Sequence, residues 1–499
     1  MKDRTLRKFQ EISALLNSSL DQAEIRKRAV DAVTALMEAE AGSLLLLDEP
    51  AGELYFEVAL GDKGEEVRQF RLKLGEGIAG YVAKTGEPVI VNDVQHDPRF
   101  WRKADNKSGF VTRNMVCVPV KAHDKLLGVL QAINRRNGSL FGEEDLQNFV
   151  ALGHQVGIAI ENANLYEEIN RLFEGFISAS VHAIESRDPT TSGHSNRVAL
   201  LTCRLAQVVD CVDWGPYAAV KFTADQMKEI RYAAVLHDFG KVGVREHVLV
   251  KELKLYPRDV ALLKARFDFI KRTLEVRTLR HKVEILQSGD CADATVKLGK
   301  LDKELARGMK DMDQMYVFLM ACNQPNVLPA GGVELLHEMA RLRYDSFEGP
   351  KPYLTTEEVT ALSIPEGSLT PDERLQIESH VAHTFDFLSK IPWTKSLKNV
   401  PMIASYHHEK LDGTGYPWRI TGDKIPVQAR MMTIADIYDA LTASDRPYKA
   451  AVPAGKALEI LEEKAVLGKI DSHLFELFVD AKVYQLVQEF PRTGRSYAA

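Results

Sequence analysis

Two adjacent histidines followed by a tight turn are the most chemically suggestive residues of this chain. His407 and His408 are followed by Glu409, Asp412 and a Gly-Tyr-Pro turn at 415–417. Neutral imidazoles combined with carboxylates are common ligands of iron, manganese and zinc ions. Paired surface histidines are also common, so this segment by itself leaves both a metal site and a plain surface turn open.

More imidazoles and carboxylates lie in the same half of the chain, several of them in apolar helical segments. The apolar run 233–236 precedes His237 and Asp238, and the apolar residues Met431, Met432 and Ile434 precede Asp436. Such residues need partners, because an unpaired buried charge is energetically costly. Each alone could be a satisfied core polar group, but the whole set favours a metal site. The set comprises His194, His237, Asp238, His380, His407, His408 and Asp436.

In type and order, these motifs resemble the ligand set of the HD superfamily of metal-dependent phosphohydrolases. The turn at 412–417 resembles the signature of its HD-GYP subfamily, and the resemblance covers about 175–250 and 366–460. It implies a bacterial phosphodiesterase that opens cyclic di-GMP to linear pGpG, with further cleavage to GMP left open. It also implies that the seven residues above are metal ligands and that Asp238 bridges two ions.

The same resemblance assigns contacts to the substrate. Lys241, one helical turn beyond Asp238, corresponds to a lysine that contacts the scissile phosphate, so Lys241 and Asp238 are the expected catalytic residues. Tyr416 is expected near the substrate, although its loop could simply fix a turn. Arg446 and Lys449 match a basic segment expected to meet the dinucleotide's phosphates.

The ligand types imply a dinuclear centre. Imidazole and carboxylate ligands without a thiolate favour iron or manganese over structural zinc. Some family members carry a glutamate four residues before the first ligand histidine, where it supports a third metal. Thr190 occupies that position here, and Glu185 lies too far upstream to replace it. We therefore expect two metals.

A long insertion interrupts the resemblance, because far more residues separate His237 from His380 than is usual in the family. Apolar stripes predict two antiparallel helices that form a coiled hairpin around a turn at 288–290. The insertion at 254–365 is either a regulatory arm, a lid or an extra dimer surface, or a tolerated surface insertion. The stripes are Val260, Leu263, Phe267, Ile270 and Leu274, then Leu298, Leu301, Leu305, Met312, Tyr316 and Leu319.

The first third of the chain alternates helix and strand signals. Helices are expected over 5–40, and strands at 43–47, 54–60, 68–74, 89–91, 116–121 and 126–134. This pattern predicts an antiparallel sheet with helices on one face. The motifs at 75–80, 85–88, 112–119 and 141–145 resemble a GAF domain, a class that binds small molecules such as cyclic nucleotides or serves only in dimerisation.

One detail bears on a ligand for that domain. Asn134-Arg135, Phe141 and Asp145 are similar to a motif of cyclic-nucleotide GAF domains, but Arg135 replaces a lysine and Leu146 a glutamate. The pattern can be purely structural, so ligand binding stays open. Cys117 lies in an apolar strand and is expected in the core.

A single helix is predicted from Gly142 to about Arg187. Its apolar stripe favours a homodimer formed by coiled-coil packing, and the alternative is packing on its own domain's sheet. The stripe consists of Leu146, Phe149, Val156, Ile160, Ala163, Ile169, Leu172 and Phe176.

Bulk properties limit the remaining possibilities. A chain of 499 residues should hold two or three domains. The net charge of −6 argues against coating nucleic acid, and no apolar run approaches the roughly 20 residues that cross a bilayer. Five scattered cysteines favour free thiols in a reducing cytoplasm. We expect a cytoplasmic protein with neither nucleic-acid nor membrane partners.

The expected architecture is an α+β multidomain chain. It consists of a GAF-like sensor domain at 1–165, a linker and dimerisation helix at 142–187, an all-α HD-GYP catalytic domain at 175–253 and 366–499, and the helical-hairpin insertion. The expected activity is hydrolysis of cyclic di-GMP, regulated by the GAF domain. The alternatives are hydrolysis of another cyclic dinucleotide such as cyclic GMP-AMP, and a weakly active receptor or scaffold that binds cyclic di-GMP.

Overall fold

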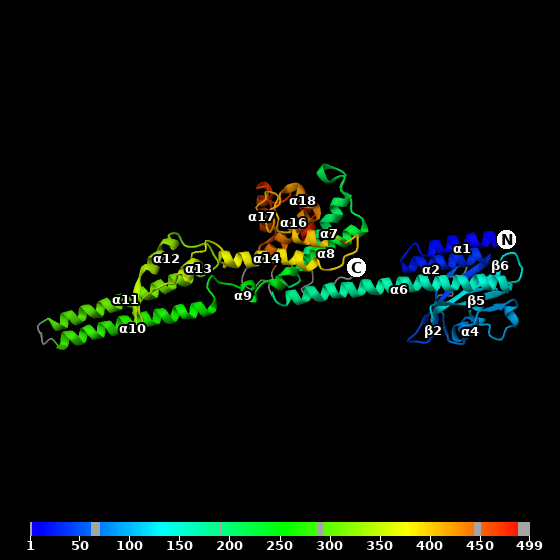
Figure 1. Cartoon of the computed structure of the whole chain (residues 1–499), viewed down its shortest axis with the longest axis horizontal. Helices are drawn as coiled ribbons and strands as arrows, with labels where there is room; N and C mark the ends of the chain where they lie inside the picture. Colours follow the sequence, from blue (N-terminus) through cyan, green and yellow to red (C-terminus); the bar gives the residue numbers. More distant parts are fainter. Residues whose placement is uncertain (1, 61–69, 189–191, 288–292, 444–450, 488–499) are drawn as a thin grey trace. The chain divides into compact units, whose positions relative to one another are not determined.

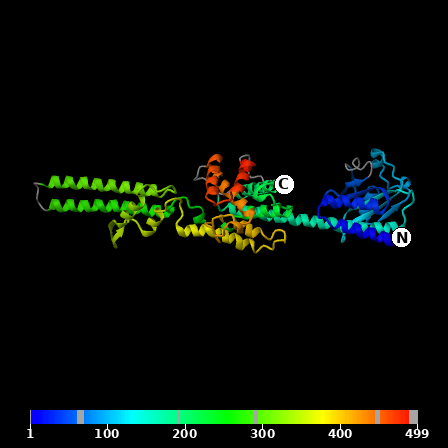
Figure 2. The same cartoon turned by 90° about the horizontal axis from the view of Figure 1, so that it is seen from above.

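The computed structural model describes residues 2–60, 70–188, 192–287, 293–443 and 451–487. The chain divides into two compact units, residues 1–176 and 177–499 (Figures 1 and 2). None of the described helices is both long and apolar enough to cross a membrane.

The first unit is built on an antiparallel sheet with the strand order β3-β2-β1-β6-β5-β4. Leu44 and Leu46 face a core shared with α1, α2 and α6, whereas Leu45 faces a second core shared with α4. Helices therefore cover both faces of the sheet, not one face as expected, because alternate residues of the central strands are apolar on both sides (Figure 1). The strands are β1 (Ala39–Asp48), β2 (Glu53–Leu60), β3 (Arg71–Lys73), β4 (Val89–Val91), β5 (Met115–Ala122) and β6 (Lys125–Arg135).

The helices predicted over 5–40 are present, except that the second ends before residue 40, and the helix at 103–108 was not predicted. Its cap is at Met37, and β1 begins at Ala39. Arg135 pairs with Asp145 at 2.5 Å and lies over the ring of Phe141, which joins the last strand to the start of α6. The Asn-Arg…Phe…Asp pattern therefore has a structural role. The helices are α1 (Lys2–Leu16), α2 (Gln22–Leu36), α4 (Gly77–Thr85) and α5 (Lys103–Ser108), with a 3-10 turn η1 (Val94–His96).

The predicted long helix is α6 (Glu143–Glu185). Phe149, Val156 and Ile160 pack into the core of the first unit. The first half of the predicted stripe is thus covered by its own domain. The last three residues of the stripe, Ile169, Leu172 and Phe176, are 63%, 75% and 58% exposed.

The second unit is helical around the motifs, as predicted. Residues 192–253 contain α7 (His194–Cys211), α8 (Ala224–Leu236) and α9 (Glu246–Leu249), with 3-10 turns η3 (Gly215–Tyr217) and η4 (Phe239–Gly243). Residues 366–487 contain α14 (Pro371–Leu388), α15 (Val400–Ser405), α16 (Val427–Thr442), α17 (Ala454–Val466) and α18 (Ser472–Asp480), with 3-10 turns η5 (Gly422–Lys424) and η6 (Val483–Val487).

The insertion contains the expected hairpin of α10 (Pro257–Gln287) and α11 (Ala294–Cys322), which lie side by side (Figures 1 and 2). Leu263, Phe267 and Ile270 pack with Met312 and Leu319 in one core, as the stripes predict. The predicted turn at 288–290 lies outside the described residues. Four further elements follow: α12 (Gly332–Arg341), the strand pair β7 (Arg343–Ser346) and β8 (Gly349–Pro352), and α13 (Thr356–Leu362). The strand pair was not predicted.

Candidate metal centre

Three histidines of the predicted set are held in the same way by their own helical turns. The Nδ1 atoms of His237, His380 and His407 lie 2.7, 2.6 and 2.7 Å from the carbonyl oxygens of Ala234, Ile377 and Ala404. A carbonyl can only accept a hydrogen bond, so the proton of each neutral imidazole is on Nδ1. Each Nε2 therefore keeps a free lone pair, which is the atom that binds a metal.

Those three lone pairs are buried and unused. Nε2 of His237, His380 and His407 is shielded from solvent and makes no hydrogen bond within the described part of the chain. Buried polar atoms are usually hydrogen-bonded, so three such atoms in one place need an explanation. A divalent cation is a partner that suits all three, and the donor set fits the expected metal.

The imidazoles form two groups. Ligand atoms of His194, His237 and Asp238 lie within 4.8 Å of one another, and so do those of His380, His407 and His408. They come from the start of α7, the junction of α8 and η4, helix α14 and the turn after α15. The structure therefore brings six of the seven predicted ligands into two adjoining clusters.

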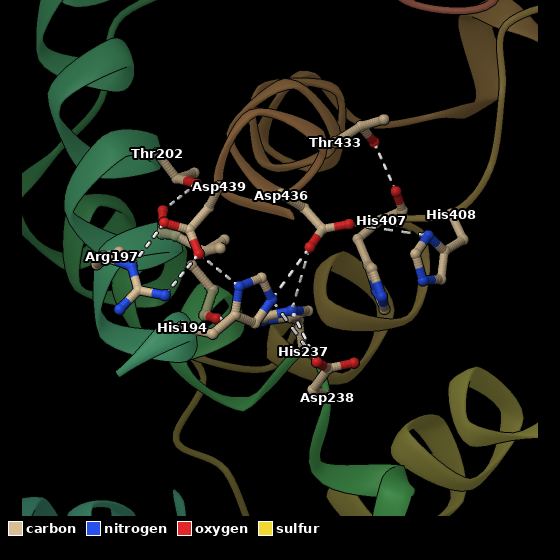
Figure 3. A network of polar contacts seen from close by, with 12 residues as sticks. His194, Arg197, Thr202, His237, Asp238, His407, His408, Thr433, Asp436 and Asp439 are labelled. Atoms are coloured by element: carbon tan, nitrogen blue, oxygen red, sulfur yellow. Dashed lines mark hydrogen bonds and ion pairs between the residues drawn. The ribbon is translucent and has the colours of Figure 1, made fainter. Parts of the chain in front are cut away.

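Two carboxylates connect these clusters. Oδ2 of Asp238 lies 3.4 Å from Nε2 of His237, while its Oδ1 lies 3.3 Å from Nε2 of His380. Oδ1 of Asp436 lies 3.2 Å from Nε2 of His194, and its Oδ2 lies 3.9 Å from Nδ1 of His408. Figure 3 shows Asp436 between His194 and His408. Each carboxylate thus offers one oxygen to each cluster.

The electrostatics of the clusters favour ionised carboxylates and neutral imidazoles at His407 and His408, whereas they favour the charged form of His194. Burial holds the pKa of His407 well below its usual value and lowers the pKa of His408 to about 3. Burial opposes the charge of Asp436, but its hydrogen bond with His194 and the neighbouring imidazoles outweigh this and lower its pKa. Burial likewise opposes a charge on His194, but Asp436 and Asp439 raise its pKa to about 9.

A second layer of contacts orients His194. Its Nδ1 lies 2.7 Å from Oδ2 of Asp439, and Nε of Arg197 donates to the other oxygen of that carboxylate at 2.7 Å (Figure 3). Asp439 is buried on α16, one turn after Asp436. Sequence analysis assigned it no role, although its position three residues after Asp436 on one helix was a usable signal.

The segment after His237 is packed tightly against α14. Oγ1 of Thr384 donates to the carbonyl of His237 at 2.9 Å and accepts from the backbone N–H of Gly240 at 2.8 Å. A Cβ on Gly240 would lie 1.8 Å from the carbonyl oxygen of His380. Glycine is therefore required here for η4 and α14 to approach, and this approach brings His237 and His380 together.

Lys241 lies beside Asp238 of the first cluster. Its Nζ is 2.9 Å from Oδ2 of Asp238 and 3.3 Å from Oδ2 of Asp188. Burial would lower the pKa of Lys241, but the two carboxylates outweigh it and raise the pKa. The ammonium group is therefore charged at neutral pH. Asp188, which sequence analysis did not single out, helps to hold it.

The Gly-Tyr-Pro loop lies against the second cluster. The ring of Tyr416 is 4.7 Å from the ring of His408, and burial raises the pKa of its phenol, which stays protonated. The buried carboxylate of Glu409 accepts hydrogen bonds from the backbone N–H groups of Trp418, Arg419 and Ile420, at 2.8, 3.2 and 3.1 Å. Glu409 therefore positions the loop that carries Tyr416, a role that sequence analysis did not assign.

Three residues of the sequence-based expectation lie outside the described residues. These are Arg446 and Lys449, expected at the substrate's phosphates, and Thr190, on which the absence of a third metal rests. Glu185, which was set aside as a third-metal ligand, accepts a hydrogen bond from the backbone N–H of Gly193 at 3.0 Å, directly before His194.

Comparison with known families agrees with this architecture. A family described as GAF domain matches residues 19–161, and one described as HD domain matches residues 356–474. The chain carries a GAF domain and an HD domain. The HD match contains His380, His407, His408 and Asp436, and an HD domain implies binding of divalent metal. His194 and His237 lie before the matched segment and join it only in the tertiary structure.

Several curated proteins are similar over part of their length. A 3'3'-cGAMP-specific phosphodiesterase of Vibrio cholerae is 46% identical over 97 residues, which is 19% of this chain and 20% of that protein. A probable 3',5'-cyclic phosphodiesterase of Caenorhabditis elegans is 32% identical over 145 residues, 27% of this chain and 20% of that protein. The chain thus spans about a fifth of the length of each. The solved GAF domain of an Acinetobacter phosphoenolpyruvate-protein phosphotransferase is 25% identical, with a TM-score of 0.30, over 34% of this chain and 99% of that one.

Proposed function

We propose that this chain is a metal-dependent phosphodiesterase that hydrolyses cyclic di-GMP to linear pGpG. The observation that carries the proposal is the pair of carboxylates, Asp238 and Asp436, that each offer one oxygen to both imidazole clusters. Two carboxylates shared in this way suit two neighbouring divalent cations. The HD domain of the chain and the phosphodiesterases named above support the same class of reaction.

The proposed ligands are the seven residues predicted from the sequence. His194, His237, Asp238 and Asp436 would hold one cation, and His380, His407 and His408 the other, with both carboxylates available to each. Nitrogen and oxygen donors without a thiolate suit iron or manganese. When bound, such cations supply Lewis acidity, which stabilises negative charge on a phosphoryl oxygen and makes water more acidic.

Two further residues would act on the substrate itself. The charged Nζ of Lys241 would bind an oxygen of the scissile phosphate and offset the negative charge that develops on it. The phenol of Tyr416 is protonated and lies beside His408, so it can donate a hydrogen bond to the dinucleotide. Neither residue needs to give up its proton in these roles.

A second cyclic dinucleotide is the main alternative substrate. The Vibrio cholerae relative is named for 3'3'-cGAMP, and its identity of 46% is the specific observation in favour. Cyclic di-GMP and 3'3'-cGAMP differ in one base, so both place the same phosphodiester at the metals. A comparison of kcat/KM for the two substrates decides between them, and a higher value for 3'3'-cGAMP would overturn the cyclic di-GMP assignment.

We also propose that the GAF domain regulates the site through α6. Arg187, two residues beyond the end of this helix, is bonded to the catalytic segment. Its Nη1 donates to the carbonyl of Val242 at 2.7 Å, and its Nη2 donates to that of Val244 at 3.2 Å. Val242 follows Lys241 directly. A small movement at the end of the helix would therefore displace Lys241. This holds for any small molecule that binds the GAF domain, such as a cyclic nucleotide.

A homodimer through α6 completes this proposal. Together with Asn162, the exposed apolar residues of α6 form a stripe with alternating four- and three-residue steps. Asn162 occupies one of its a positions, a choice that favours two-stranded coiled coils in fixed register. Paired glutamates at Ile169 and Leu172 should weaken the dimer, which analytical ultracentrifugation measures as a higher dissociation constant. The exposed stripe is Ile158, Leu165, Ile169, Leu172 and Phe176.

One assay tests the central proposal and its rival, a receptor that binds cyclic di-GMP without cleaving it. Anaerobically purified, metal-loaded protein is incubated with cyclic di-GMP, 3'3'-cGAMP and cyclic GMP, and the products are separated by chromatography. We expect pGpG, and loss of turnover with His237→Ala plus Asp238→Ala. His473→Ala, an exposed histidine outside the clusters, is the matched control. Tight binding without turnover would favour the receptor, and turnover in the double variant would overturn the site.

Metal analysis gives an independent test. We expect two ions per subunit, iron or manganese, in the wild-type chain. Three ions per subunit would contradict the dinuclear proposal. The proposed location is the cytoplasm, a reducing compartment in which the described cysteines Cys117, Cys203, Cys211 and Cys322 would stay free thiols, as they are in the structure.

A further inference from the structure

The outer side of α10 carries an apolar stripe that its own hairpin does not cover. Val276, Leu279, Val283 and Leu286 follow one another at steps of three, four and three residues, and they are 38–63% exposed. The buried stripe of the same helix, which contains Phe267, faces α11 instead. α10 therefore has two apolar faces, and only one of them is used within the hairpin.

Aromatic residues extend this exposed face. Phe269, seven residues before Val276, is 38% exposed, and its ring lies 6.4 Å from that of Phe347. Phe347 sits in the turn between β7 and β8 and is fully exposed. From Phe269 to Leu286 the stripe rises about 26 Å along the helix. Exposed apolar surfaces of this kind mark interaction sites. We call it the outer seam: Phe269, Val276, Leu279, Val283, Leu286 and Phe347.

We propose that the outer seam binds the same seam of a second copy of this chain, with the two α10 helices parallel and in register. Val276 and Val283 occupy the a positions of a heptad, and Leu279 and Leu286 its d positions. Valine at a with leucine at d favours two parallel strands, because these shapes pack best in that geometry. The periodicity thus specifies a helix of the same heptad as partner, and a second copy supplies one.

The flanking charges suit the same pairing. Glu275 is at the g position and Arg280 at the following e position, five residues later. In a parallel, in-register pair, each g residue faces the e residue five positions on in its partner. Glu275 would therefore face Arg280 of the other copy, twice by symmetry. Within one chain, Glu275 pairs only along its own helix with Arg272 among the described contacts.

Disulfide cross-linking of the full-length chain tests the pairing. Leu279→Cys is made in a background with Cys211→Ser, which removes an exposed native thiol, and Cys291→Ser, which removes the cysteine between α10 and α11 in the sequence. In the proposed pair Leu279 faces its own copy, so mild oxidation should link two chains. Val317→Cys, exposed on α11 and outside the seam, is the matched control. Any dimer made by α6 raises the local thiol concentration in both variants. The ratio of their cross-linking rates therefore reports contact at the outer seam itself.

We expect Leu279→Cys to cross-link roughly tenfold faster than Val317→Cys, because the seam holds the two thiols at high effective concentration. Equal rates would overturn the proposal, whether the seam then binds another protein, a lipid surface or nothing. An antiparallel pair would also fail to link residue 279 to itself and would overturn it.

Charge reversal tests the register. In the Leu279→Cys background, Glu275→Arg and Arg280→Glu should each slow cross-linking, since each places like charges across the pair. The two changes together should restore the rate, because opposite charges then face again. Failure of the double variant to recover would contradict the parallel register. These positions are on the surface of the hairpin, so loss of folding does not explain a slower rate that the second change reverses.

Discussion

Nδ1 of His194 lies 2.7 Å from Oδ2 of Asp439, although 245 residues separate the two along the chain. Because Nδ1 is held by this contact, the other ring nitrogen, Nε2, points toward Asp436 and Asp238. Burial would raise the pKa of Asp439, but hydrogen bonds from His194 and Arg197 outweigh it and keep the carboxylate ionised. Asp439 is therefore a positioning residue for the proposed metal centre.

Asp439→Asn should weaken metal binding without unfolding the protein. The amide keeps the shape but loses the charge that favours the metal-binding tautomer of His194, and such changes lower affinity about 10–100-fold. Calorimetric titration of metal-stripped protein with Mn²⁺ measures the change. Asp386→Asn, an exposed carboxylate on α14, is the control and should leave the affinity unchanged. Equal affinities in the two variants would show that Asp439 does not orient a ligand.

Gly240→Ala should destabilise the second unit. The added Cβ would lie 1.8 Å from the carbonyl oxygen of His380, so η4 and α14 must separate. Overpacking of this kind costs about 1–3 kcal/mol. Urea unfolding measures the free energy of unfolding. Gly299→Ala in α11, where nothing lies within 4 Å of the new Cβ, should be neutral or stabilising. The same loss of stability in both would refute the close contact.

Lys241→Gln should lower kcat while leaving the metal content intact. Glutamine removes the positive charge from the proposed phosphate contact, and the loss of one such group typically reduces kcat about 10²–10³-fold. Kinetics with cyclic di-GMP and metal analysis of the same sample give the two measurements. Lys251→Gln is the control, because Lys251 forms a buried pair with Glu373 and does not contact the clusters. A Lys241 variant with full kcat would remove this residue from the reaction.

Arg187→Ala should loosen the segment that carries Lys241. The variant would lose the two hydrogen bonds from the charged side chain to the carbonyls of Val242 and Val244. Each such bond contributes at most about 3 kcal/mol to stability. Hydrogen exchange of the peptide covering 239–243 should therefore speed up. Arg171→Ala, whose pair Glu167 lies on the same helix, should leave this peptide unchanged. Unaltered exchange in both would argue against α6 as the transmitter.

Local periodicity was enough to predict most of the secondary structure. Strands and the hairpin helices follow the spacing of apolar residues, because a strand or helix must bury one face. The limits appear on α6. Its stripe was treated as one surface, but Phe149 is buried against the sheet while Leu172 is exposed. The apolar pattern gives the face of a helix, whereas coverage of that face depends on segments far away in the chain.

The candidate site, too, was predictable in part from the sequence and depends in part on the tertiary structure. The side-chain types favoured a metal site, because imidazoles and carboxylates are rare in apolar helical segments without a partner. The resemblance to the HD superfamily, carried by the order of the motifs from His194 to Asp436, supplied the proposed ligands and Lys241. The roles of Asp439, Asp188 and Glu409 depend on contacts with residues distant in sequence or on loop geometry, and no local pattern contains these. Only the tertiary structure decides that residues on both sides of the insertion meet, because the approach of η4 to α14 at Gly240 is a packing contact and not a property of either segment alone.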